Sequence, residues 1–60
     1  MRWSCEMGIV KADGTWELRT YAVEAADLEQ ARVLAAFQAE LDCVDLPHVQ
    51  IFDYSIIEAS

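Results

Sequence analysis

The residues best suited to chemistry follow one another closely in the second half of the chain. His48 is the only histidine, and Asp42, Cys43 and Asp45 precede it at short spacing. A cysteine nucleophile, a histidine base and an orienting carboxylate are the parts of a covalent catalyst. Their spacing matches no such site, however, and a histidine that follows a proline is typical of an exposed loop. We therefore expect no catalytic residue and no enzyme activity.

The same region could supply ligands to a metal ion. Its potential ligands are Asp42, Asp45, His48 and Asp53. Calcium loops need closely spaced oxygen ligands around a glycine turn, and structural zinc sites need more Cys and His ligands than this chain has. Gly8 and Gly14 are the only glycines, so there is no Gly-rich phosphate loop. The sequence predicts neither a metal site nor a cofactor.

Acidic residues are the most informative feature. Eleven Asp and Glu residues stand against four Lys and Arg, which gives a net charge of −7. Three carboxylates cluster at the end of the expected helix with no basic residue near in sequence: Glu40, Asp42 and Asp45. The helix dipole disfavours each carboxylate there by roughly 0.3–1 kcal/mol. Four more border the expected strands: Glu6, Glu17, Glu24 and Asp53.

These seven carboxylates admit two interpretations. They could act as phosphate surrogates that face Lys or Arg of a partner protein, or they could serve solubility alone. Direct binding to DNA, RNA or an anionic membrane is not expected, because such proteins are normally basic.

The sequence also indicates the cellular compartment of the protein. No apolar run approaches 18 residues, and no signal-peptide pattern follows Met1. Cys5 and Cys43 are far apart and outside any CxxC motif, which favours a cytoplasmic protein with reduced thiols but leaves a single disulfide open.

A helix is predicted over Asp27 to Leu41. Asp27 is a good N-cap residue, and Gln30 completes a capping-box pattern. Helical projection predicts a broad apolar stripe facing the sheet, which consists of Leu28, Ala31, Leu34, Ala35, Phe37 and Leu41 with Gln38 inside it.

Two strands are predicted before the helix, over Met1–Lys11 and Trp16–Ala25. The first alternates, with Trp3, Cys5, Met7 and Ile9 on one face. Asp13-Gly14 between the strands indicates a hairpin. A two-residue turn would place Trp16 and Leu18 on the face of Trp3, whereas a three-residue loop with a bulge at Gly14 would place Tyr21, Val23 and Ala25 there. We favour the second register near the helix.

A loop is predicted over Val44–His48, because Pro47 forbids further helix. A third strand is predicted over Val49–Ile57, and Glu58 to Ser60 are expected to fray. Both faces of this strand carry apolar residues, and the face of Phe52 and Tyr54 is favoured as the buried one.

The predicted fold is α+β, a β-β-α-β domain of residues 1–60. A helical crossover after a hairpin gives a three-stranded antiparallel sheet of order 2-1-3 with the helix on one face.

Aromatic residues exceed what one sheet face holds easily. We expect one or two of Trp16, Tyr21 and Tyr54 on the uncovered face, where aromatic side chains are typical interface anchors.

The segment YAVEAADLEQARVLA resembles a strand-to-helix joint common in very small phage and mobile-element proteins. Together with small size and acidity, it is similar to anti-CRISPR proteins and other phage-encoded inhibitors of host defence. The resemblance implies a stoichiometric inhibitor, in the cytoplasm of a host cell, that blocks the nucleic-acid site of a defence complex.

The sequence therefore predicts one of two functions. The first is a small acidic protein-binding module that occupies a basic, nucleic-acid-binding surface of such a complex. The alternative is a structural or oligomerisation module without a nucleic-acid-related partner, which would form a homodimer through the exposed sheet face or a free strand edge.

Overall fold

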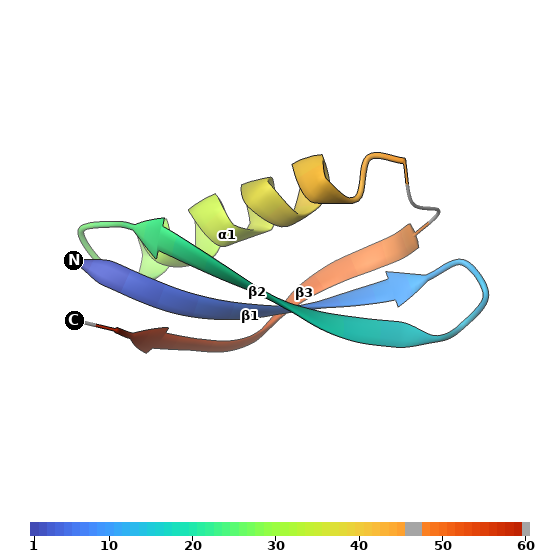
Figure 1. Cartoon of the computed structure of the whole chain (residues 1–60), viewed down its shortest axis with the longest axis horizontal. Helices are drawn as coiled ribbons and strands as arrows, with labels where there is room; N and C mark the ends of the chain where they lie inside the picture. Colours follow the sequence, from blue (N-terminus) through green and yellow to red (C-terminus); the bar gives the residue numbers. More distant parts are fainter. Residues whose placement is uncertain (46–47, 60) are drawn as a thin grey trace.

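Three antiparallel strands form one sheet, and a single helix lies across one of its faces (Figure 1). The computed structural model describes residues 1–45 and 48–59, with the side chains of residues 48 and 49 left out. Its elements are β1 (Arg2–Lys11), β2 (Trp16–Glu24), α1 (Leu28–Asp42) and β3 (His48–Glu58). The sheet order is β2-β1-β3, which confirms the predicted α+β fold with order 2-1-3.

The β1–β2 hairpin adopts the register with the longer loop. Trp3 pairs with Val23 and Cys5 pairs with Tyr21. Gly14 has φ of 91°, a left-handed conformation that glycine adopts without strain, and its N–H donates to the Lys11 carbonyl at 3.1 Å. The three-residue loop therefore settles the register in favour of Tyr21 and Val23 on the helix-covered face.

β3 changes face in its middle because its pairing with β1 shifts between Glu6 and Met7. In the first half of β3, Ile51 pairs with buried Ile9. In the second half, after the shift, Ile56 pairs with buried Cys5. Both isoleucines pack against the core. Phe52 instead pairs with Gly8 on the uncovered face. The expectation that the aromatic face of β3 is buried as a whole is wrong, since an extra residue divides the strand into two registers.

β3 also extends further than predicted. Glu58 pairs with Trp3, and the Ala59 N–H donates to the Arg2 carbonyl at 2.8 Å, so these two residues continue the sheet edge rather than fray. The predictions for Leu46, Pro47 and Ser60 fall outside the described residues.

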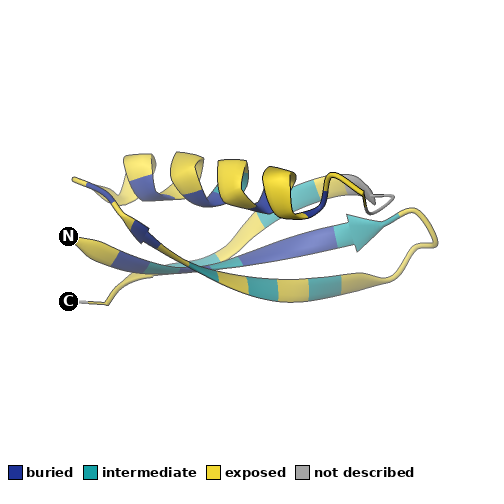
Figure 2. Cartoon of the chain, turned by 45° about the horizontal axis from the view of Figure 1, so that its top comes forward, coloured by how far each residue is buried: buried dark blue, intermediate teal, exposed yellow. Residues whose placement is uncertain are grey.

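α1 packs on the sheet through small side chains. Ala31, Ala35 and Ala39 are completely buried, whereas Leu34, Phe37 and the other large apolar residues of the helix are exposed. Figure 2 shows this contrast between the inner and outer sides of α1. The predicted stripe is therefore wrong for Leu34, Phe37 and Leu41. Leu28 is also exposed, but it lines a groove between the start of α1 and β3. Three alanines at a spacing of four residues form a flat ridge that lets the helix approach the sheet closely.

The start of α1 is fixed as the sequence predicts. The Asp27 carboxylate accepts a hydrogen bond from the Gln30 N–H at 2.8 Å, and the Gln30 side chain accepts one from the Ala26 N–H at 2.6 Å. Two of the N–H groups at the helix start are thereby satisfied.

Candidate functional site

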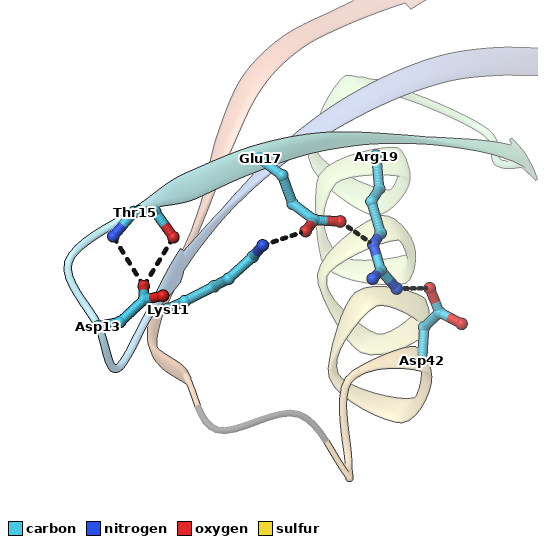
Figure 3. Close-up of polar contacts among 6 residues, drawn as sticks. All are labelled: Lys11, Asp13, Thr15, Glu17, Arg19 and Asp42. Carbon is cyan, nitrogen blue, oxygen red and sulfur yellow. Dashed lines mark hydrogen bonds and ion pairs between the residues drawn. The ribbon is translucent and has the colours of Figure 1, made fainter.

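Four charged residues form a continuous network between the hairpin and the end of α1 (Figure 3). The side chain of Tyr21 joins this network. Lys11 Nζ lies 2.8 Å from a Glu17 carboxylate oxygen, and Arg19 Nε lies 2.6 Å from the other. Arg19 also donates to Asp42 Oδ2 at 2.7 Å, and the Tyr21 hydroxyl donates to the same oxygen at 2.9 Å. The network ties β1, β2 and α1 together beside the core.

The network shifts the pKa of each of its four charged members toward the charged form. Hydrogen bonds from Lys11 and Arg19 lower the pKa of Glu17, and those from Arg19 and Tyr21 lower the pKa of Asp42. Desolvation, followed by its bond to Asp42, raises the pKa of Tyr21 to about 12. Glu17 and Asp42 thus stay ionised and engaged within the molecule.

The surroundings of Asp42 differ from those that the sequence predicts. No basic residue follows it in sequence, but β2 brings Arg19 to it across the fold. Arg19 offsets the unfavourable interaction between this carboxylate and the helix dipole. Of the seven predicted site residues, Glu17 and Asp42 are therefore brought together, around a cation of the same chain.

The uncovered face of the sheet carries an aromatic bridge. Trp16 on β2 and Phe52 on β3 approach each other across β1, with ring centroids 6.2 Å apart and planes tilted by 51°. Gly8 of β1 lies under the Phe52 ring, where a side chain would collide with it. Leu18 lies opposite Gly8 on β2. Trp16 remains 55% exposed, so the bridge is an accessible apolar surface.

Two carboxylates lie on the same uncovered face of the sheet, nearer the start of β1. Glu6 is half-buried between Thr20 and Ser55, and Glu24 lies opposite Arg2, which it contacts at 4.0 Å. Ile57 is exposed between them on β3. We refer to Trp16, Leu18, Phe52, Ile57 and Glu6 as the open face. Trp16 therefore lies on the uncovered side of the sheet, which confirms the prediction that at least one of the named aromatic residues does so.

The remaining predicted carboxylates lie elsewhere. Glu40 and Asp45 are exposed at the C-terminal end of α1 and in the turn after it. Asp53 is exposed where β3 changes register, and with Tyr54 it lines a shallow groove of about 280 Å³ against the start of α1. The seven carboxylates therefore form no single patch. Their separation follows from the alternation of strands and the distance between the two ends of α1, which spacing in sequence does not reveal.

Of the candidate catalytic residues, the structure describes the side chains of Asp42, Cys43 and Asp45. Cys43 is completely buried, and desolvation raises the pKa of its thiol, which disfavours the nucleophilic thiolate. Cys5 is also buried, and both thiols are free. The side chain of His48 lies outside the described part of the structure. Within that described part, no three His, Cys, Asp or Glu side chains gather as metal ligands.

The basic side chains are all engaged. Each of the four Lys and Arg residues is paired with a carboxylate: Arg2 with Glu24, Lys11 with Glu17, Arg19 with Glu17 and Asp42, and Arg32 with Glu29. The negative net charge consequently has no basic patch to balance it on the described surface.

Comparisons with known proteins add no relative. No family model, no curated protein and no solved structure matches the chain. Among residues 1–45 and 48–59, no helix is sufficiently long and apolar to cross a membrane.

Proposed function

We propose that this chain is a non-catalytic protein-binding module whose open face docks on a basic surface of a nucleic-acid-binding complex. The carrying observation is the uncovered sheet face, on which the exposed Trp16 and the half-buried Phe52 form an aromatic anchor beside Glu6. Aromatic residues at the centre of a contact and charges around it are the usual division of labour in protein interfaces. Occupying such a surface would make the chain a stoichiometric inhibitor.

Charge supports this choice of partner. Because all four basic side chains are already paired, the surplus carboxylates give the molecule a negative field that attracts Lys and Arg of a partner. The resemblance to phage-encoded inhibitors of host defence agrees with such a partner and with action in the host cytoplasm.

The first experiment captures the partner and then tests the open face. Tagged protein is incubated with host lysate at low and high salt, and the partner is identified. Affinity is then measured for Glu6→Lys and Trp16→Ala, with Gln38→Lys on α1 as a control that places a lysine away from the open face. We expect roughly tenfold weaker binding for Glu6→Lys, weaker binding for Trp16→Ala and little change for the control.

The result that contradicts the proposal is equally specific. Open-face variants that keep wild-type affinity for the captured complex would exclude this face as the contact. Reversal of Asp42 is a poor test, because a lysine there would face Arg19 and disturb the fold.

A further inference from the structure

A shallow groove lies between the start of α1 and β3, and its volume is about 280 Å³. The apolar residues that line it are Leu28, Tyr54 and Ile56, and the charged ones are Glu29, Arg32 and Asp53. Small-molecule sites usually measure about 300–1,000 Å³ and enclose most of their ligand. A groove below that range suits a side chain of another polypeptide better than a free small molecule.

The groove has a surplus of negative charge. Arg32 donates a hydrogen bond to Glu29 on the same helix, so these two charges offset each other. Asp53 is exposed, and the Lys and Arg residues of the chain are all paired with other carboxylates. A Lys or Arg of an incoming polypeptide would therefore find an ionised partner in Asp53.

β3 lies at the edge of the sheet, and in the described part of the chain no strand pairs with its outer side. The Ala59 N–H donates to the Arg2 carbonyl at 2.8 Å, and backbone groups along an antiparallel strand point alternately to its two sides. The N–H and carbonyl groups of Ile56 and Glu58 therefore point away from β1. Such groups are a template on which another extended chain can form hydrogen bonds.

The side chains along this edge are spaced as an added strand requires. The register shift in β3 places three of its residues opposite every second residue of β1, on the helix-covered face. These residues are Asp53, Ile56 and Glu58, which pair with Met7, Cys5 and Trp3. The complementary segment therefore has an apolar residue opposite Ile56 and a basic residue two positions away on each side.

We propose that the groove and the outer edge of β3 bind an extended basic segment of a partner protein, which joins the sheet as a fourth, antiparallel strand. Both existing pairings are antiparallel, and this pairing is the more stable one per residue. The apolar side chain of the segment lies against Leu28 and Ile56, and its basic residues face Asp53 and Glu58. A second copy of this chain is a poor occupant, because its β3 would set carboxylates against carboxylates.

Synthetic peptides test the chemistry of the occupant. The probe is a blocked peptide of sequence TKTLTKT, and its controls are TETLTET and the basic peptide with its leucine N–H methylated. Fluorescence anisotropy follows binding up to about 1 mM protein. We expect roughly tenfold weaker binding of both controls, since one loses its charge complementarity and the other its hydrogen bond to Ile56. No binding of TKTLTKT over this range, or equal binding of the methylated peptide, would overturn the proposal.

Variants of the protein test the position of the bound peptide. Asp53→Asn removes a carboxylate at the groove, and Asp45→Asn makes the same change beyond the far end of α1 as the matched control. We expect TKTLTKT to bind Asp53→Asn roughly three- to tenfold more weakly and Asp45→Asn without change. Equal weakening by the two substitutions would show that the peptide responds only to net charge, and would refute the groove as its site.

The groove lies on the helix side of the sheet, so this inference does not rest on docking through the open face. Trp16→Ala should bind TKTLTKT as the wild type does, and bound peptide should shift the amide resonances of Ile56 and Glu58 but not that of Leu18. A failure of open-face docking would leave these results intact. Shifts confined to the open face, or a dimer in sedimentation that the peptide disrupts, would reveal another site or a second copy at this edge and contradict the proposal.

Discussion

At the scale of single residues, Gly8 has the clearest structural role. It lies on the central strand directly beneath the Phe52 ring and so allows the aromatic bridge to span β1. A methyl group at this position would be 2.6 Å from Phe52 Cε2, which no packed structure accommodates. The glycine is required for contact and not for backbone conformation.

Gly8→Ala should therefore displace Phe52 from Trp16. We expect a loss of about 1 kcal/mol in the free energy of unfolding, since the ring can swing toward solvent but forfeits its aromatic contact. Denaturant unfolding measures the loss, and tryptophan fluorescence reports the altered surroundings of Trp16. In a Phe52→Ala background the same substitution should cost nothing. An equal cost in both backgrounds would show that the ring is not the cause.

At the scale of elements, the contact between α1 and the sheet is set by its alanines. Ala31, Ala35 and Ala39 leave no space between the helix and β1, so helix position depends on side-chain size there. The charged network provides a second attachment, at the C-terminal end of the helix, through Arg19 and Asp42.

Ala35→Leu should push the helix away from the sheet. The expected loss is about 2–3 kcal/mol in the free energy of unfolding, at the upper end for an overpacked core. Gln38→Leu adds the same side chain at an exposed helix position and should change stability by less than about 0.5 kcal/mol. Unfolding of both variants, measured at low protein concentration, tests the claim. Equal stability of the two would mean that Ala35 does not face the sheet.

At the scale of the whole molecule, charge governs the dependence of stability on pH. Glu17 and Asp42 have pKa values below their ordinary 4.5 and 3.8, because the basic partners stabilise the ionised carboxylates. A lowered pKa in the folded state contributes stability above the ordinary pKa, and this contribution is lost as pH falls through the lowered value. Protonation of other carboxylates acts in the opposite direction by relieving repulsion within the acidic surface.

A comparison of variants isolates the contribution of the network. Asp42→Asn should lower stability at pH 7, and the difference from wild type should shrink as the pH falls below about 4. Glu6→Gln removes one negative charge from the other side of the sheet without touching the network, and as the control it should not lower stability at pH 7. Urea unfolding across this pH range provides the measurement. A difference that persists unchanged at the lowest pH would show that the Asp42 effect is not electrostatic.

The sequence by itself determined the elements and their order. Alternation in β1, the Asp13-Gly14 turn and the Asp27 cap depend on neighbours in the chain, which is why the fold and its strand order could be predicted. Composition likewise fixed the acidic character of the molecule. Local patterns contain this information because caps, turns and strand alternation arise from contacts between residues close in sequence.

Only the tertiary structure decided which side chains are covered and which charges are paired. Hydrophobicity alone placed Phe37 and Leu41 in the core, but the close approach of helix and sheet admits alanines and leaves the larger residues outside. The shift in β3 moved Phe52 to the open face, and the hairpin register carried Arg19 to Asp42. Each of these outcomes depends on volume and distance between segments far apart in the chain, and such quantities exist only once the chain has folded.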